Sequence, residues 1–259
     1  MNTLARSSMR DRLRAGGTHL AVCSVIALLT MALIFLGWYP APLAQAQGVS
    51  RLLLILVAVD VTVGPLITVL IFDRAKKSLS FDLAVIACCQ LAFLLYGLHA
   101  IFAGRPAIIA YNVDRFDVVQ AQDVDRQSLE RSIGAGKAGL PWLRPRIVYA
   151  QLPSDRDKRQ ELMFQAVVGG SDLPQMAEWY EPYENGKDDV AKHVRPLSEL
   201  RKVNGMDEVA WADFLGSLNR QETELGYLPL RAKSKDGAVI VDARTAEIIR
   251  ITMLEPKWS

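Results

Sequence analysis

The chain has 259 residues, of which 51% are hydrophobic and 22% are charged, and this composition excludes a disordered, collagen-like or disulfide-stapled protein. Residues 1–104 hold only 8 of the 30 Lys and Arg residues and 4 of the 28 Asp and Glu residues. The first part is therefore apolar with a small positive excess, whereas residues 105–259 resemble a soluble domain with a small negative excess. No basic face is expected in that domain, so we predict no nucleic-acid partner.

Three apolar stretches predict three transmembrane helices. They cover residues 19–38, 52–72 and 83–103, and together they contain one charged residue, Asp60. Each matches the roughly 20 residues that a helix needs to cross the hydrocarbon core. None shows the polar face, repeating every 3.6 residues, that is typical of a helix in a soluble protein. The sequence thus predicts a tail over residues 1–18, a transmembrane domain over 19–104 and a further domain over 105–259.

The basic residues beside these spans predict their orientation. The tail carries four arginine residues and one acid, Asp11, whereas the loop over residues 39–50 carries no charge. The next loop, over residues 73–82, again carries three basic residues. We therefore expect a bacterial inner-membrane protein with a cytoplasmic N-terminus and with residues 105–259 in the periplasm.

A secretory signal peptide is the alternative interpretation of the N-terminal stretch. Ala44-Gln45-Ala46 resembles a signal peptidase site that follows a charged start and an apolar segment. The apolar segment is longer than the roughly 7 to 15 residues of a signal core, which favours a retained span. Residues 105–259 reach the same side of the membrane in both cases.

All three cysteine residues, Cys23, Cys88 and Cys89, lie within the predicted spans. The expected periplasmic domain therefore contains no disulfide, although its compartment would permit one. With about 155 residues it is large enough to form its own hydrophobic core.

The pattern over residues 105–259 predicts an α+β domain. Residues 107–120 predict one strand or a pair of short strands. Further strands are expected at 146–152, 227–233, 238–242 and 247–252. The last three of these would form a β-meander. Helices are expected at 126–133, at 155–168 behind a Ser154 cap, and from Asp207 to Asn219. The last helix would bury a stripe made of Val209, Ala212, Leu215 and Leu218, and residues 174–194 predict short helical pieces with loops.

Signals for catalysis, metals and cofactors are weak. Gly134 to Gly139 fits G-x-G-x-x-G, but this run follows a predicted helix instead of a strand and precedes Pro141, so we interpret it as a turn. A zinc site or a Ser-His-Asp triad in the expected periplasmic domain would depend on its single histidine, His193, which lies in a charged run. We predict no catalytic residue, no metal, no cofactor and no enzymatic activity.

Asp60 is the residue that conflicts most with its surroundings. An acid in the middle of a span costs about 2.5 to 3.5 kcal/mol on insertion scales, so it must face protein or water. Gly64, Pro65 and Thr68 lie on or beside the same helical face. Small and weakly polar residues of this kind allow close contact between helices.

Two interpretations of this stripe remain open. In the first, Asp60 forms an internal hydrogen bond with Thr30 of the first span or Tyr96 of the third, which lie at about the same depth. In the second, Asp60, Gly64, Pro65 and Thr68 bind a transmembrane helix of a partner protein.

Several stretches resemble the TfpX/TfpZ family of type IV pilin accessory proteins. They are Val59 to Leu66, residues 76–79 with 81–86, Arg105-Pro106 with residues 113–119, and Trp38-Tyr39-Pro40. The resemblance covers about residues 20–125. It implies an inner-membrane protein that supports the stability, assembly or surface level of a particular pilin, without a known catalytic residue. The major pilin and membrane lipid are the implied partners, and other inner-membrane pilus-assembly proteins are further candidates.

Three classes of function follow from these observations. A pilin before assembly is a transmembrane helix with a periplasmic head, so a chaperone-like accessory protein would use both parts of this chain. The alternative is a membrane-anchored periplasmic enzyme acting on pilin or envelope components, which would need a pocket with convergent acids near His193 or Gly134. A sensor that signals inward is disfavoured, because only a tail and a short loop are expected in the cytoplasm.

Overall fold

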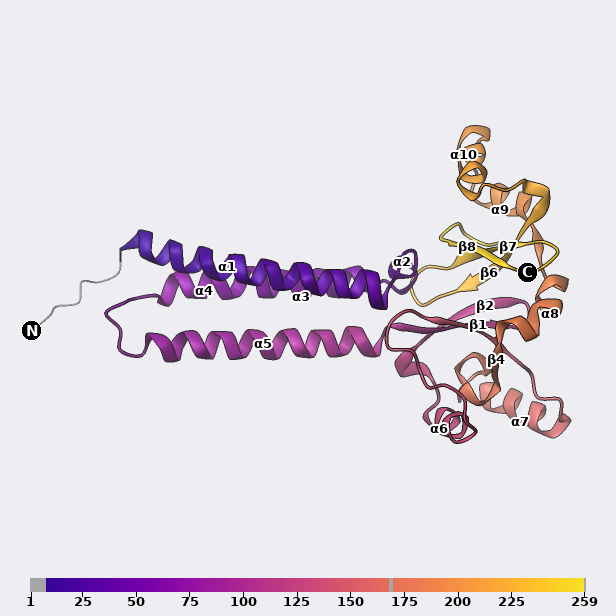
Figure 1. The fold of residues 1–259 in the computed structure, drawn as a ribbon, viewed down its shortest axis with the longest axis horizontal. Helices are drawn as coiled ribbons and strands as arrows, with labels where there is room; N and C mark the ends of the chain where they lie inside the picture. The colour runs from indigo at the N-terminus through magenta and orange to yellow at the C-terminus, as the bar shows by residue number, and fades with distance from the viewer. Residues whose placement is uncertain (1–7, 168–169, 259) are drawn as a thin grey trace, which may run out of the picture. The chain divides into compact units, whose positions relative to one another are not determined.

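The structure is a computed structural model that describes residues 8–167 and 170–258. Its contacts divide the chain into two compact units (Figure 1). The first unit comprises Met1–Gly37 and Val49–Ala103, and the second comprises Trp38–Gly48 and Gly104–Ser259. The predicted tail and transmembrane domain fall together in the first unit, except that Gly104 and the segment between the first two spans, Trp38–Gly48, belong to the second unit.

The first unit consists of helices. They are α1 (Met9–Ala32), the π-helical segment η1 (Leu33–Trp38), α3 (Val49–Ala58), the π-helical segment η2 (Val59–Val63), α4 (Gly64–Ile71) and α5 (Leu79–Ala103). In the described part of the chain, three continuous helical stretches, Met9–Trp38, Val49–Ile71 and Leu79–Ala103, are long and apolar enough to cross a membrane. The three expected spans are thereby confirmed as helices. The first begins earlier than expected, because the Ser8 side chain caps α1 by accepting a hydrogen bond from the Asp11 N–H.

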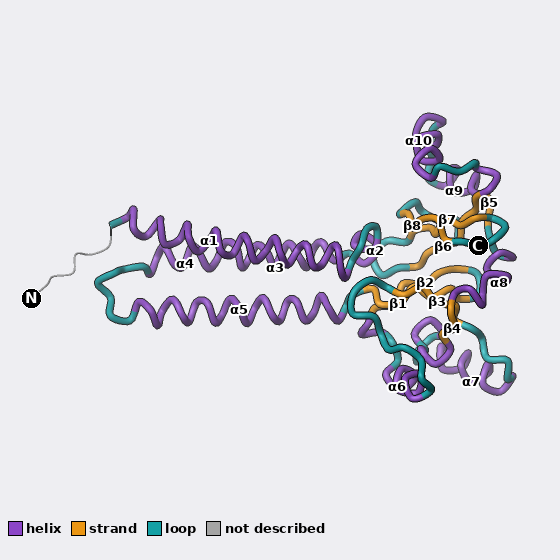
Figure 2. The backbone as a smooth tube through the Cα atoms, viewed as in Figure 1, coloured by secondary structure: helices purple, strands orange, loops and turns teal. Residues whose placement is uncertain are grey.

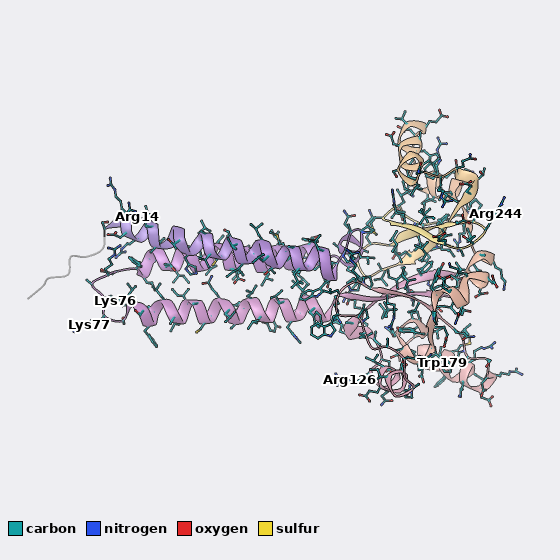
Figure 3. All side chains as sticks on the ribbon, viewed as in Figure 1. Arg14, Lys76, Lys77, Arg126, Trp179 and Arg244 are labelled. Carbon is teal, nitrogen blue, oxygen red and sulfur yellow. The ribbon has the colours of Figure 1, made fainter. Side chains whose placement is uncertain are left out.

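The basic residues that predict orientation gather at one end of this unit. Arg14, Lys76 and Lys77 lie together at the end where α1 begins and where α4 is connected to α5 (Figure 3). Asp11 and Arg74 form an ion pair of 3.3 Å across this end. The charge asymmetry of the sequence is therefore also an asymmetry in space, as the positive-inside rule requires.

The second unit is built on one mixed β-sheet. Its strands, among the described residues, are β1 (Pro106–Asn112), β2 (Arg115–Gln120), β3 (Arg146–Ala150), β4 (Tyr180–Pro182), β5 (Arg195–Pro196), β6 (Leu225–Arg231), β7 (Gly237–Asp242) and β8 (Ile248–Thr252). They lie in the order β4-β3-β1-β2-β6-β7-β8, and β5 pairs with β6. The β1–β3 and β2–β6 pairs are parallel and the others are antiparallel. The expected α+β class, the β1–β2 pair and the β-meander are confirmed, whereas β4 and β5 were not expected.

Helices cover this sheet. They are α2 (Leu43–Gln47), α6 (Arg126–Gly134), α7 (Arg156–Val167), α8 (Lys187–Lys192), α9 (Leu197–Val203) and α10 (Glu208–Leu218), with 3-10 turns at 121–123, 173–175, 177–179, 183–186 and 222–224. The predicted Asp207 cap is confirmed, because its carboxylate accepts the Ala210 N–H at 2.8 Å. At the start of α7 the N–H of Asp157 donates to the Asp155 carboxylate. Ser154, the expected cap, does not accept this hydrogen bond.

The expected apolar stripe of α10 is wrong in part. Val209 is 71% exposed, whereas Trp211 is 4% exposed and packs with Leu218 in the core beside the sheet. The large indole is therefore the side chain that fixes which face of α10 is buried. A pattern of aliphatic residues alone does not reveal this rotation.

The two faces of the sheet carry different cores. One face carries a single continuous cluster that includes Tyr111, Phe116, Leu228 and Val239. The other face carries two separate clusters, one under α7 and one under α9 and α10. Figure 2 shows the strands between these two helical groups. Since β1, β6 and β7 are buried on both faces, their sequences read as apolar runs without strict alternation.

The segment between the first two spans packs into the continuous core. Leu43 and Ala46 of α2 are members of that cluster and are 3% and 0% exposed. The carbonyl of Ala46 accepts the N–H groups of Ser234 and Lys235 at 2.9 and 3.2 Å. Gln47 Oε1 accepts a hydrogen bond from Gln120 Nε2 at 2.8 Å. This uncharged loop is thus a folded part of the sheet domain.

This packing bears on the signal-peptide alternative. Ala44 and Ala46 are the small residues of the sequence that resembles a signal peptidase site. Both lie in the short helix α2 and are buried. Cleavage after Ala46 would remove Leu43 and Ala46 from the core of the sheet domain, so their packing favours a retained first span.

We expect Leu43→Ala to destabilise the sheet domain, because it removes a buried side chain and leaves a cavity in the continuous core. Substitutions of this kind cost about 2 to 5 kcal/mol. Thermal unfolding of the full-length protein in detergent, followed by circular dichroism, measures the effect. Leu54→Ala is the matched control, because Leu54 is 70% exposed on α3. Equal unfolding temperatures for the two variants would contradict the packing described above.

Candidate functional site

Glycine residues bring the three spans into close contact. A Cβ atom on Gly16 would collide with Val69, one on Gly64 with Gln90, and one on Gly97 with Leu56. Each pair joins two different spans, so α1, α4 and α5 approach one another where one side lacks a side chain. Such close approach is the usual way in which membrane helices associate.

The polar residue Asp60 lies in the π-helical segment η2, directly before α4. In a π-turn the carbonyl of Asp60 would be paired with the N–H five residues later, but that residue is Pro65, which has no N–H. The amide of Gln90 on α5 supplies the missing donor, at 3.0 Å from the Asp60 carbonyl. The proline thus creates a free backbone acceptor, and a side chain of another span satisfies it.

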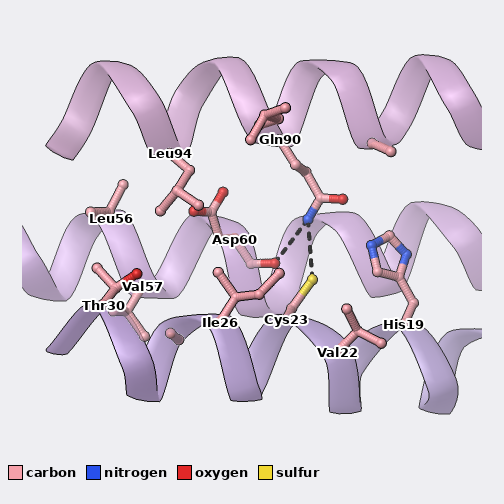
Figure 4. A pocket seen from close by; sticks show the side chains of 13 residues that line it. His19, Val22, Cys23, Ile26, Thr30, Leu56, Val57, Asp60, Gln90 and Leu94 are labelled. Carbon is pink, nitrogen blue, oxygen red and sulfur yellow. Dashed lines mark hydrogen bonds between the residues drawn. The ribbon is translucent and has the colours of Figure 1, made fainter. Parts of the chain in front are cut away.

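A cavity of about 180 Å³ lies between the three spans at this level. Its polar lining residues are His19, Cys23, Thr30, Asp60 and Gln90, and the remainder of its lining is apolar. Figure 4 shows the Gln90 amide between the Asp60 backbone and the Cys23 side chain. Gln90 Nε2 lies 3.6 Å from Cys23 Sγ. We refer to this space as the Asp60 cavity.

The carboxylate of Asp60 remains unsatisfied beside this cavity. Its Oδ1 atom is buried and has no hydrogen-bond partner among the described residues. Thr30 lines the same cavity, whereas Tyr96 is 75% exposed on α5. In the described part of the chain no hydrogen bond joins the Asp60 carboxylate to either residue. A buried carboxylate oxygen without a partner is costly, so this group is suited to a donor supplied from outside the bundle.

The other residues of the predicted stripe are engaged inside the bundle. Gly64, Pro65 and Thr68 are buried, and Gly64 faces Gln90. The Thr68 hydroxyl donates to the Gly64 carbonyl at 3.0 Å and lies 2.7 Å from His19 Nδ1. Of the four residues expected to bind a partner helix, Asp60 alone lines the cavity. The role of all four in binding a partner stays a prediction.

Residues considered for an enzymatic site are held by structural contacts. His193 Nδ1 lies 3.0 Å from both the Tyr111 hydroxyl and the Asp189 carbonyl, so it closes the end of α8. In the Gly134 turn, Lys137 donates to the carbonyls of Glu178 and Tyr180. These interactions attach His193 to β1 and α8, and they attach Lys137 to β4 and to the turn before it.

An ion pair between a buried aspartate and a partly exposed arginine on the sheet was not expected from the sequence. Asp117 of β2 is 4% exposed and contacts Arg231 of β6, its neighbour in the parallel register. Burial raises the pKa of Asp117, while the guanidinium groups of Arg231 and Arg115 act in the opposite direction. The pair lines a groove of about 290 Å³ with Asp172 and Lys233. Its partners are far apart in sequence, so no local motif indicates it.

A second groove lies beside α6 and α7 and has a volume of about 690 Å³. Arg131 and Glu178 form a two-pronged ion pair at its wall, with distances of 2.9 and 2.7 Å. The side chain of Trp179, labelled in Figure 3, also lines it.

The chain is similar to fimbrial assembly proteins. The family described as fimbrial assembly protein FimB matches residues 7–48. The fimbrial assembly protein of serogroup I of Dichelobacter nodosus is 24% identical over 233 residues, which is 88% of this chain and 90% of that protein, and the serogroup E1 protein matches equally well. The protein of serogroups C1 and C2 is 28% identical over 113 residues, covering 43% of this chain and 86% of the relative. No solved structure matches the chain significantly.

We expect Gly64→Ala to weaken the bundle by displacing Gln90. The flexible Gln90 side chain can rotate away from the new methyl group, but the Asp60 carbonyl then loses its donor, at a cost of about 1 to 3 kcal/mol. Thermal unfolding in detergent measures the effect. Gly17→Ala is the control, since a Cβ at Gly17 meets nothing within 4 Å.

The same effect should disappear when Gln90 is already absent. In a Gln90→Ala background, Gly64→Ala should be nearly neutral, because no amide remains to be displaced. An undiminished loss of stability in the double variant would show that another contact of Gly64 is responsible.

Proposed function

We propose that the protein is a membrane-bound assembly factor for fimbriae of the type IV pilus class, and that it binds the pilin subunit and supports its stability or assembly. The observation that carries this proposal is the similarity over 88% of the chain and 90% of a protein named as a fimbrial assembly protein. The resemblance to the TfpX/TfpZ accessory proteins points in the same direction. The protein would act by binding instead of catalysis.

The layout of the chain suits a partner with one membrane helix and a folded head. Three apolar helices offer a surface inside the bilayer, and the sheet domain offers grooves outside it. We propose that the Asp60 cavity receives a polar or cationic group of the partner's helix. The support for this assignment is the buried Oδ1 atom of Asp60, which lacks a hydrogen-bond donor among the described residues.

The enzyme alternative lacks a comparable observation. His193 and Lys137 form hydrogen bonds to residues of β1 and β4, and neither lines the polar groove beside α6 and α7. We therefore keep binding as the proposed activity.

The location proposed for the protein is the bacterial inner membrane, with α1 beginning in the cytoplasm and the sheet domain in the periplasm. Support comes from the basic residues at one end of the helices and the uncharged segment over residues 39–48.

Cysteine labelling tests this orientation. The exposed residues Ser78 and Ser198 lie in the basic loop and in the sheet domain. A membrane-impermeant maleimide should label Ser198→Cys in intact spheroplasts and Ser78→Cys only after lysis. The unmodified protein measures the background from its own three cysteines. Labelling of Ser78→Cys in intact spheroplasts would reverse the orientation.

Co-purification tests pilin binding. The tagged full-length protein, extracted mildly from the membrane of its native host, should recover the major pilin. Asp60→Leu should lower the recovery by roughly tenfold, because a hydrogen bond to a charged group contributes about 1.5 to 3 kcal/mol. Thr62→Val is the matched control, since Thr62 is exposed on the same π-helical segment and does not line the Asp60 cavity.

The outcomes separate the parts of the proposal. Recovery that Asp60→Leu leaves unchanged would remove the cavity from the pilin-binding surface. A deletion strain with normal surface pili, combined with no recovered pilin, would contradict the proposed function itself.

A further inference from the structure

One side of α5 carries a stripe of exposed residues with the spacing of a coiled-coil seam. Its members alternate between four and three residues apart and are Phe81, Val85, Cys88, Ala92, Leu95 and His99. All six are exposed, including Phe81 at 71% and Leu95 at 57%. We refer to them as the outer stripe of α5. With this spacing two parallel helices can wind around each other and keep one continuous line of contact.

The opposite side of α5 is used within the chain itself. Gln90 donates to the Asp60 carbonyl, and a Cβ atom on Gly97 would collide with Leu56. At 3.6 residues per turn, Gln90 and Gly97 lie roughly half a turn around the helix from Cys88 and Ala92. The bundle therefore occupies one side of α5, and the outer stripe faces away from it.

Two polar side chains make the outer stripe a poor match for lipid. Tyr96, beside Leu95, is 75% exposed, and His99 is exposed as well. Neither has a hydrogen-bond partner among the described residues. Tyr96 precedes the end of α5 by seven residues, about 10 Å along the axis, and side chains on a helix tilt toward its N-terminus, which here is away from that end. Hydrocarbon offers no partner for the Tyr96 hydroxyl, so leaving it unpaired is costly.

Tyr96 and His99 complement each other in two copies of the chain. A phenol can donate a hydrogen bond, and a neutral imidazole has one nitrogen that accepts. The two residues are one turn apart on one side of α5, so in a parallel pair of these helices each Tyr96 lies within reach of His99 of the other copy. A two-fold axis forms this hydrogen bond twice. Two copies inserted in the same direction are parallel without any further requirement.

We propose that the protein forms a parallel homodimer in the membrane through the outer stripe of α5, in which Tyr96 of each copy donates to His99 of the other. Cys88 and Ala92 lie at the middle of this contact, and their small side chains let the two helices approach closely. No residue of the outer stripe lines the Asp60 cavity. The dimer contact is thus independent of the pilin binding proposed above.

Disulfide cross-linking in membranes tests the contact. The full-length protein is produced in a bacterium without type IV pili, with Cys88 and Cys89 replaced by alanine and the buried Cys23 retained as the background. Single cysteines are then returned to the outer stripe, as Cys88 itself or through Ala92→Cys and Leu95→Cys. Oxidation with copper phenanthroline should convert most of each variant into a disulfide-linked pair of identical chains.

The matched control is Phe93→Cys in the same background. Phe93 follows Ala92 directly and is 61% exposed, but it lies off the outer stripe. It should cross-link at least tenfold more slowly than Ala92→Cys, because its side chain does not face the second copy.

Substitution of the polar pair tests the hydrogen bond. Tyr96→Phe and His99→Leu should each raise the dissociation constant of the dimer about tenfold, since each removes both symmetric bonds. Energy transfer between two labelled populations in detergent measures this constant. The double variant should be no weaker than either single variant, because all three lack the same bonds. Asp60→Leu should leave the constant unchanged, which separates this contact from pilin binding.

Four results would overturn the proposal. Absence of cross-links at all three positions of the outer stripe would mean that α5 faces lipid there. Equal rates for Phe93→Cys and Ala92→Cys would show random collision. Cross-links from Ala92→Cys to a different protein would assign the outer stripe to another partner. Additive effects of Tyr96→Phe and His99→Leu would show that these side chains do not bond to each other.

Discussion

The sheet domain depends on the packing of residues 38–48 into its continuous core. The Ala46 carbonyl satisfies two N–H groups of the turn between β6 and β7, and Leu43 fills space beside the strands. Because this segment connects the first two spans, the chain crosses between the two compact units three times, at residues 37/38, 48/49 and 103/104. Residues 105–259 alone would lack Leu43 and Ala46 and would expose apolar strand surface. The sheet domain therefore needs a segment that lies between two membrane helices in the sequence, so it is not encoded by residues 105–259 alone.

The sequence predicts the three spans and the α+β class of the domain that follows them, but it does not predict the strand order of the sheet. Hydrocarbon thickness imposes a length on each span, so composition alone locates them. The β-meander is local, and its turns at Asp236-Gly237 and Arg244-Thr245 can be recognised from residue type. Strands β4 and β5 are short and pair with distant partners, so no local period reveals them. The docking of α2 is hidden for the same reason, since a short run of Ala, Gln and Leu has no distinctive pattern.

The candidate site was only partly visible in the sequence. Asp60 stands out because an acid is rare in a span. The reason for its local geometry lies five residues on, where Pro65 removes the N–H that a π-turn would use. The partner that compensates, Gln90, is an uncharged polar residue in the third span, and nothing in its neighbours indicates which carbonyl it serves. Contacts between spans depend on helix rotation, which hydropathy does not determine.

The polar groups of the bundle divide into satisfied and unsatisfied ones. His19, Thr68 and the Gln90 amide each have a hydrogen-bond partner inside the bundle and hold α1, α4 and α5 together. The Asp60 carboxylate contributes nothing to that set, since its buried Oδ1 has no partner among the described residues. A group that only held the helices together would be expected to have a partner, because burial without a donor lowers stability. This difference between Asp60 and the other polar groups of the bundle is the reason for proposing Asp60, and not His19, Thr68 or Gln90, as the group that meets a partner helix.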